Sequence, residues 1–137
     1  MQGVIGDLQA RQGAGSIVNI LSMHAHGGTP ELGIYASTKG ALATLTKNAA
    51  NAHLAEGIRV NGINLGWVVT PAEDHMQRVV LGKGPDWQAE TAKDLPLKRF
   101  VGAEEAARLA VFMLSDASTP MTGALVDFDQ QVVGIKH

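Results

Sequence analysis

The chain has 137 residues, of which 45% are hydrophobic, with 11 Lys and Arg against 13 Asp and Glu and no cysteine. The near-neutral charge lacks the basic surface of a nucleic-acid-binding protein, and a chain without cysteine has neither disulfides nor thiolate metal sites. No apolar run approaches the roughly 18 residues of a membrane-spanning helix, and the first residues lack the pattern of a signal peptide. We therefore expect one soluble, cytoplasmic domain.

The first half of the chain alternates between helix and strand patterns. A weak helical pattern over residues 1–12 precedes the apolar, β-branched run of residues 16–21, which is typical of a strand buried on both faces. A helix is then predicted from Pro30 to about Glu56. Thr29 is its expected N-cap, and Gly57 is the residue that stops it.

The second half continues the alternation. Residues 58–65 predict a second buried strand, residues 103–115 an amphipathic helix and residues 124–128 a third strand. Between them, residues 71–95 predict two short helical pieces, the second capped by Asp86. The order strand, helix, strand, helix, strand predicts right-handed crossovers and a parallel sheet of the α/β class. An edge strand as apolar as residues 16–21 needs a further neighbour, so we expect the sheet to be incomplete on that side.

Three polar residues follow the first strand at informative spacing. Tyr35 and Lys39 are four residues apart on a predicted helix, so their side chains share one face. A lysine ammonium beside a phenol favours the phenolate, which lowers the tyrosine pKa below its reference of about 10. Ser22 lies just past a parallel strand, where α/β sheets bind ligands. The spacing alone is also compatible with an ordinary solvated pair and a loop serine.

Four stretches, "GSIVNILS", "YASTK", "GIRVNGINLG" and "TPMTGALVDFD", occur in the order found in the C-terminal half of the short-chain dehydrogenase/reductase family, which the chain resembles over nearly its whole length. The resemblance implies a Rossmann-like three-layer parallel sheet, truncated to about its last three strands and their helices, in a single partial domain over residues 1–137. It also implies NAD or NADP as cofactor and an alcohol/carbonyl pair as substrate. Tyr35 would be the general acid/base, Lys39 would assist it and bind the nicotinamide ribose, and Ser22 would position the substrate oxygen. Tyr35 and Lys39 would both be cofactor-binding residues as well.

The resemblance extends to the loop "LGWVVTP" after the second strand. In the family this loop holds the nicotinamide carboxamide, which assigns Gly66, Val68 and Thr70 to cofactor binding. Leu65 replaces the proline that the family usually has, a change that removes no donor. Asn61 matches a structural asparagine of the family.

The family's glycine-rich turn, Thr-Gly-x-x-x-Gly-x-Gly, does not occur in this sequence. We therefore expect that the first four strands of the family's sheet are not encoded here, and that the isolated chain binds NAD or NADP poorly and turns over little. Nothing in the sequence chooses between NAD and NADP. The alternative function is a non-catalytic fragment or pseudoenzyme that retains the fold and an oligomer interface.

The sequence gives weaker support to two other kinds of site, a metal site and a hydrolase site. His24 and His26 form an H-x-H pair, but no third ligand stands at recognisable spacing, so no metal site is predicted. A hydrolase would use Ser22, one of these histidines and an acid such as Asp127. No Gly-x-Ser-x-Gly elbow surrounds Ser22, which disfavours that reading.

The family places its substrate lid where residues 71–95 lie. The substrate candidates are His24, Trp67, Met76 and Trp87. The alternative for Met76 and Trp87 is that they simply close a small core. The tail "DFDQQVVG" and the loop "NLGW" suggest a sugar or polyol as the small-molecule substrate, and no nucleic acid or membrane partner is expected.

The alanine-rich helix over residues 33–56 suggests a second kind of partner. In the family this helix packs against its copy in a neighbouring subunit, and its small residues permit close approach. We therefore expect a homo-oligomer through this helix, with packing against the chain's own sheet as the alternative for its other face.

Overall fold

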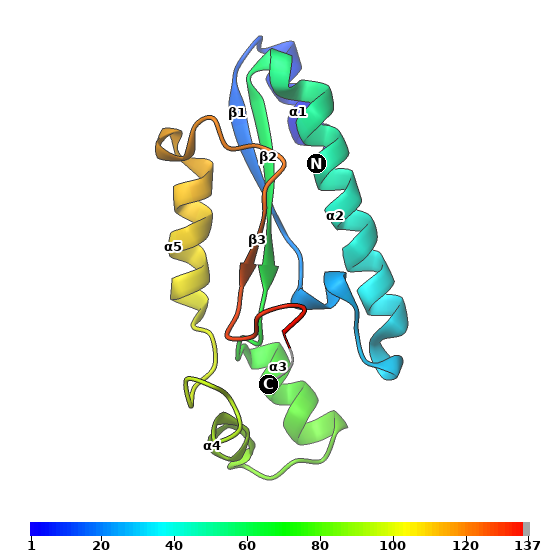
Figure 1. Ribbon diagram of the computed structural model, residues 1–137, viewed down its shortest axis with the longest axis vertical. Helices are drawn as coiled ribbons and strands as arrows, with labels where there is room; N and C mark the ends of the chain where they lie inside the picture. The colour runs from blue at the N-terminus through cyan, green and yellow to red at the C-terminus, as the bar shows by residue number, and fades with distance from the viewer. Residues whose placement is uncertain (136–137) are drawn as a thin grey trace.

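A computed structural model of the protein describes residues 1–135. Three parallel strands, β1 (Gly15–Ile20), β2 (Ile58–Leu65) and β3 (Leu125–Phe128), form a sheet in the order β1-β2-β3 (Figure 1). The register pairs Ile17 with Val60 and Asn64 with Asp127. The predicted α/β class and parallel sheet are thereby confirmed.

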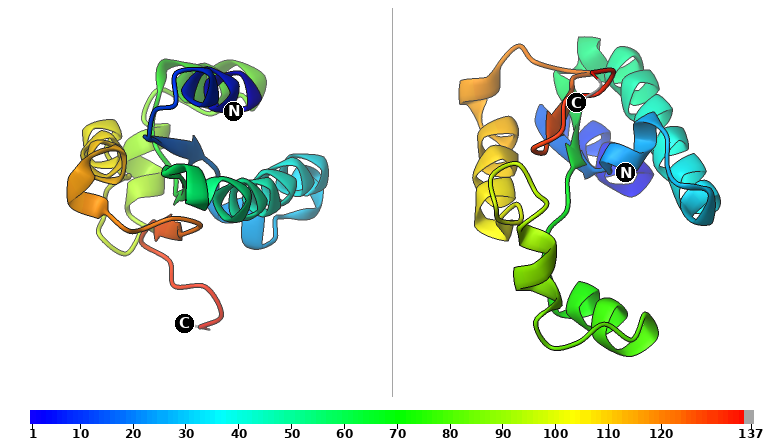
Figure 2. Two further views of the ribbon diagram at one scale, coloured as in Figure 1. Left: turned by 90° about the horizontal axis from the view of Figure 1, so that it is seen from above. Right: turned by 60° about the horizontal axis from the view of Figure 1, so that its bottom comes forward.

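Helices cover both faces of this sheet. The helices α1 (Gln2–Ala10) and α2 (Gly33–His53) pack on one face, and α5 (Ala103–Leu114) packs on the other. Figure 2 shows α5 on one side of the strands and α2 on the opposite side. The predicted inward face of α5 is confirmed, because Ala106 and Met113 are buried.

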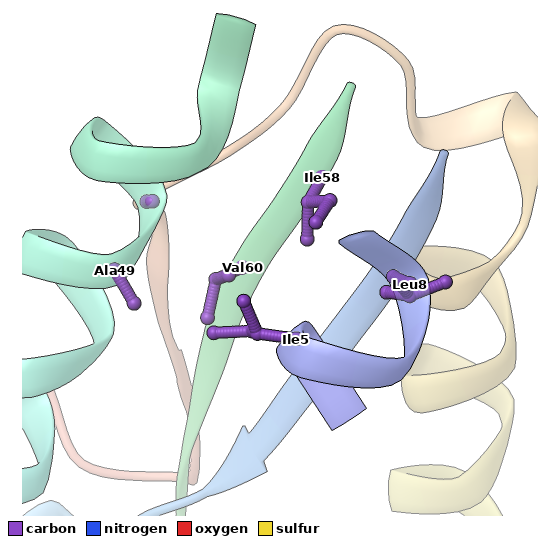
Figure 3. Close-up of a cluster of buried hydrophobic side chains, with 6 residues drawn as sticks. Ile5, Leu8, Ala49, Ile58 and Val60 are labelled. Atoms are coloured by element: carbon purple, nitrogen blue, oxygen red, sulfur yellow. The ribbon is translucent and has the colours of Figure 1, made fainter. Parts of the chain in front are cut away.

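The core lies between β2 and the layer of α1 and α2. Ile58 and Val60 on β2 belong to a cluster of buried hydrophobic side chains (Figure 3). Its other buried members are Ile5, Leu8, Ala49 and Ala50. Burial of a Val or Ile side chain contributes about 1.5–3 kcal/mol, so this cluster fixes α1 and α2 against the sheet.

The two longer strands differ in burial. Seven of the eight residues of β2 are buried, as predicted for a strand covered on both faces. The same prediction for β1 is wrong, because its residues are only partly buried and Ile20 is 47% exposed. Among the described residues β1 has only β2 as a neighbour, so its outer edge lies open.

The helix predicted from Pro30 to Glu56 is divided into three pieces. The single-turn 3-10 helices η2 (Pro30–Leu32) and η3 (Leu54–Glu56) flank α2. Thr29 is the N-cap residue of η2, with Pro30 at the first helical position as predicted, but its side chain makes no capping hydrogen bond. Gly57 ends the run with a φ of 73°, a conformation that glycine adopts without strain.

The segment 71–95 holds the two short helical pieces that were predicted. The first is α3 (Pro71–His75), which continues into a single π-helical turn, η4 (Met76–Val80), and the second is α4 (Trp87–Ala92). Thr70 caps α3 by accepting a hydrogen bond from the N–H of Glu73. Asp86 is the N-cap residue of α4, as predicted, but its side chain makes no capping hydrogen bond.

Candidate active site

The three parallel strands have their carboxyl ends at the same end of the sheet, which is where open α/β sheets bind their ligands. Ser22 lies at this carboxyl end of the sheet, two residues after β1, and is only 7% exposed. Its Oγ accepts a hydrogen bond from the backbone N–H of His24 at 3.2 Å, which caps the short 3-10 helix η1 (Met23–His26). The Ser22 hydroxyl can donate its proton to His24 Nδ1 or, in its place, to a ligand.

Tyr35 and Lys39 lie one turn apart near the start of α2. Lys39 Nζ donates to the backbone oxygen of Ile20 at 3.0 Å, and this bond ties α2 to the end of β1. The ammonium then lies 5.6 Å from the centroid of the Tyr35 ring. Tyr35 is 44% exposed, so its hydroxyl can be reached from outside.

His24 links the serine to the tyrosine. Its ring meets the Tyr35 ring edge-on, with 6.0 Å between centroids, and its Nδ1 lies 3.4 Å from Ser22 Oγ. A Cβ at Gly28 would stand 3.1 Å from the His24 ring, so the glycine gives the ring its space. The structure thus gathers His24 together with the three predicted catalytic residues, although the sequence assigned it only to substrate binding.

The loop after β2 carries the predicted cofactor contacts. Gly66 donates its N–H to the oxygen of Phe128 at 3.0 Å, and a Cβ at Gly66 would clash with the carboxylate of Asp129. Any larger residue at this point would therefore require the Asp129 side chain to move. Val68 pairs with Val101 in an isolated parallel bridge that steadies the loop.

Thr70 ends the loop with an unused donor. Its Oγ1 accepts the hydrogen bond that caps α3, at 3.1 Å from the nitrogen of Glu73. The O–H proton takes no part in that bond and can be given to a ligand.

An aromatic cluster joins the loop to the segment 71–95. The Trp67, Trp87 and Phe100 rings lie with centroids 5.2–6.3 Å apart. Trp87 is 1% exposed, and its indole N–H donates to Asp74 at 2.9 Å, which holds the pKa of that carboxyl below its usual value. The cluster anchors α3 and α4 to the sheet end.

The four substrate candidates therefore occupy different surroundings. His24 lies beside Tyr35, Trp67 is at the surface of the aromatic cluster, and Met76 is 45% exposed on η4. Trp87 is buried within the cluster. A surface hollow of about 370 Å³ lies within the segment 71–95, lined in part by His75 and Val79, and none of the three catalytic candidates lines it.

A second polar cluster lies at the same carboxyl end of the sheet, and it was not predicted from the sequence. Asp127 Oδ1 lies 2.8 Å from His26 Nε2 and 2.7 Å from Asn64 Nδ2. Partial burial works to raise the pKa of Asp127, but the hydrogen bonds from Asn64 and His26 and the charge of His26 outweigh it and lower that pKa. The parallel register that pairs Asn64 with Asp127 is the signal that identifies this pair.

The two histidines of the H-x-H pair face different partners. His24 lies beside Ser22, whereas His26 contacts Asp127, so neither histidine joins the serine to the acid as a hydrolase requires. Within residues 1–135 no group of three or more His, Asp or Glu side chains is placed to hold a metal ion. In the same part of the chain, none of the helices has both the length and the apolar character to span a membrane.

Comparison with known proteins identifies the class. A family model described as enoyl-(acyl carrier protein) reductase matches residues 4–130. Similar proteins and solved structures are short-chain dehydrogenases and reductases with the same Rossmann-like fold. The chain belongs to the short-chain dehydrogenase/reductase family, as the resemblance indicated.

Three relatives show how far the likeness extends. A cis-4-hydroxycyclohexanecarboxylate dehydrogenase of Sinomonas cyclohexanicum is 34% identical over 85% of this chain and 44% of its own length. An inactive 2-(S)-hydroxypropyl-CoM dehydrogenase 2 of Xanthobacter autotrophicus is also 34% identical, over 95% of this chain and 55% of its own. The structure of L-sorbose reductase from Gluconobacter frateurii, complexed with NADPH and L-sorbose, has a TM-score of 0.83 at 29% identity, covering 98% of this chain and 53% of its own. The chain thus spans about half the length of these relatives.

Proposed function

We propose that the chain carries the proton-transfer and nicotinamide side of an NAD(P)-dependent oxidoreductase that interconverts an alcohol and a carbonyl. The observation that carries this proposal is the grouping of Ser22, His24 and Lys39 around the exposed phenol of Tyr35. A bound nicotinamide supplies or accepts the hydride in this chemistry. The chain's own residues handle the accompanying proton.

Tyr35 is the proton donor and acceptor in this proposal. In the reducing direction its hydroxyl gives a proton to the substrate oxygen as that oxygen gains negative charge, and in the oxidising direction it takes the alcohol proton. The Lys39 ammonium stabilises the phenolate left behind. Ser22, held by its bond to the His24 N–H, donates to the same substrate oxygen and fixes its position.

The residues present suit the nicotinamide half of the cofactor. Thr70 keeps a free hydroxyl proton, and Lys39 keeps two N–H groups after its bond to Ile20. Val68 lies in the loop after β2, between Gly66 and Thr70 in the sequence, and its backbone is held by the bridge to Val101. These residues would hold the carboxamide and ribose, and the NADPH complex of L-sorbose reductase supports the choice of cofactor class.

The proposed substrate is a sugar or polyol. The support is the L-sorbose that is bound to a similar reductase, together with the polar groups of Ser22 and His24 beside Tyr35. The segment 71–95 would act as the substrate lid, with Trp67 and Met76 as its contacts. Trp87 would support the lid from within, because its ring is buried.

Two further parts of the proposal concern context. We place the enzyme in the cytoplasm, on the sequence expectation given above. The outward face of α2, where Ile34 is 86% exposed and Leu45 is 49% exposed, would pack against a second copy in a homo-oligomer.

A second candidate is a pseudoenzyme that keeps the fold. The 34% identity to an inactive dehydrogenase favours it. It predicts no thermal stabilisation by NAD or NADP, whereas the oxidoreductase predicts a rise in Tm with either dinucleotide.

The test is the Tyr35→Phe variant of the protein that contains this chain, assayed with NAD and NADP against sugars, polyols and cyclic alcohols. We expect kcat to fall by roughly 10²–10⁴-fold, the usual contribution of a general acid/base. Ser37→Ala removes a hydroxyl from the same helix and should leave kcat within about twofold. A Tyr35→Phe enzyme as active as the parent would disprove the assigned role, and the absence of any cofactor-dependent turnover by the parent would favour the pseudoenzyme.

A further inference from the structure

The cluster of His26, Asn64 and Asp127 joins three segments that are distant in the sequence. His26 ends η1, Asn64 is on β2 and Asp127 is on β3, so the contacts span separations of 101 and 63 residues. None of these side chains has a part in the proton transfer proposed above. All three nevertheless lie at the carboxyl end of the sheet, where the candidate site is.

The distances define which atom carries each proton. Two nitrogens, His26 Nε2 and Asn64 Nδ2, approach the one oxygen Asp127 Oδ1 and lie 3.1 Å from each other. A carboxylate only accepts, so both nitrogens must donate to it. The short distance between the two nitrogens is then a contact between donors, and His26 must hold its proton on Nε2.

Asp127 also determines the orientation of Asn64. The Asn64 side chain is 1% exposed, and its Oδ1 receives no hydrogen bond from residues 1–135. The opposite amide orientation would set that oxygen against the carboxylate. The carboxylate of Asp127 is therefore the acceptor around which the cluster is organised.

The bond between His26 and Asp127 affects the candidate site through η1. This short helix holds Ser22 at its cap and His24 within it, and the chain from His26 to Tyr35 is exposed throughout. On its α2 side, η1 approaches closely at Gly40, where a Cβ would stand 3.7 Å from the oxygen of Ala25. His26 supplies the side-chain bond that ties η1 to the strands.

We propose that Asp127 is a positioning residue that, through His26, fixes η1 and thereby holds His24 in place between Ser22 and Tyr35. Asp127 does not touch the reacting atoms in this arrangement. The importance of the positioning for catalysis rests on the proposed function, whereas the bonds themselves can be tested without any activity.

The test uses hydrogen exchange of the full chain, followed by NMR. The Ala25 and Gly27 amides close η1 by donating to Ser22 and His24. In Asp127→Ala they should exchange at least tenfold faster, while the reference amides of Gly62 and Ala106 change less than twofold. Exchange that is unchanged in η1, or faster everywhere by one common factor, would overturn the proposal.

The control and the rescue variants separate positioning from general destabilisation. Asp116→Ala removes a carboxylate from η5 (Asp116–Ser118), beyond the end of α5, and should leave the η1 amides unchanged. His26→Ala should match Asp127→Ala, and combining the two should add nothing further. His26→Gln keeps a donor for Asp127 and should restore slow exchange. Additive effects in the double variant would contradict the proposed bond.

A spectroscopic signature completes the test. Imidazole ¹⁵N shifts of neutral His26 should show the proton on Nε2 in the parent chain. A proton on Nδ1 would contradict the assigned geometry, whatever the activity of the protein.

Discussion

At the scale of single residues, Arg59 shows how a charged side chain is accommodated in the interior. It lies on β2, is 9% exposed, and donates to the backbone oxygens of Met113, Ser115 and Met121 and to Ser118 Oγ. Carbonyls at the end of a helix have no partner within it and carry partial negative charge. The guanidinium therefore satisfies the end of α5 and fixes that helix to β2 without an acidic partner.

Glu105 performs the corresponding task at the start of α5, and its contribution depends on pH. It accepts two hydrogen bonds from Arg99 and one from the N–H of Gly102, which together hold its pKa at about 2. A carboxyl whose folded pKa is below its ordinary value stabilises the fold above that ordinary value, and the stabilisation is lost as pH falls toward 2. We expect Glu105→Gln to lower Tm by a few degrees at neutral pH, with the difference from the parent shrinking between about pH 4.5 and 2.

Thermal melts of both proteins across this pH range provide the measurement. Glu104→Gln removes the neighbouring charge from the same first helical turn and should have the smaller effect, because Glu104 has neither of the bonds that lower the Glu105 pKa. A Tm difference for Glu105→Gln that persists undiminished at pH 2 would show that the pairing with Arg99 is not its source.

Which residues the sequence could identify depended on how far apart the partners lie. Tyr35 and Lys39 share one helix, so their spacing predicted that they face the same way, as they do. Asn61 was matched as a structural residue, and it bonds to Met121 and Ala124. The bond between His26 and Asp127 could not be predicted from spacing, because the two residues are 101 positions apart and only the tertiary fold brings η1 beside β3.

At the scale of elements, α2 separates an inward from an outward face. Its buried residues are Thr46, Ala49 and Ala50. An exposed stripe runs beside this buried face at helical spacing; its members are Ile34, Ala41, Leu45, Asn48 and Ala52. Small residues along such a stripe allow two helices to approach closely, and this is the basis for the proposed subunit contact.

Leu45→Glu tests that contact. A charge at the centre of the stripe would be buried without a partner in an oligomer, so we expect the variant to sediment as a smaller species than the parent. Analytical ultracentrifugation at several concentrations gives the measurement. Lys47→Glu introduces the same acid two positions away, off the stripe, and serves as the control. If the parent chain is itself a monomer at high concentration, the proposed interface is wrong.

The ends of an element could be predicted where burial of its side chains determines them. The bounds of β2 were predicted correctly because its apolar run is buried along its length. The segment from residue 30 to 56 has good helical composition throughout, but its ends form 3-10 turns where no side-chain cap holds them. Burial of β1 was overestimated because burial depends on a neighbouring strand and not on the strand's own residues.

At the scale of the whole molecule, the open edge of β1 and the position of the site are connected. The residues proposed to hold the nicotinamide follow β1 and β2, whereas the glycine-rich turn that grips phosphates in dinucleotide-binding folds does not occur in the sequence. Under the proposed function, the candidate site and the open edge belong to one arrangement, in which this chain would contact only one end of the cofactor.

This arrangement makes a specific prediction about ligands. If the chain contacts only the nicotinamide and its ribose, then NADP and nicotinamide mononucleotide should bind to it with Kd values within about threefold of each other. Both should be weak, near the millimolar range, because a small ligand held by a few hydrogen bonds gains only about 4 kcal/mol. Titration of the 137-residue chain by saturation-transfer NMR measures both constants. Thr70→Val, which loses the hydroxyl donor, should weaken the two ligands equally, whereas Thr44→Val on α2 should affect neither. NADP binding at least thirtyfold tighter than the mononucleotide would mean that this chain also grips the adenosine half, and the assignment of only one end of the cofactor to it would then be wrong.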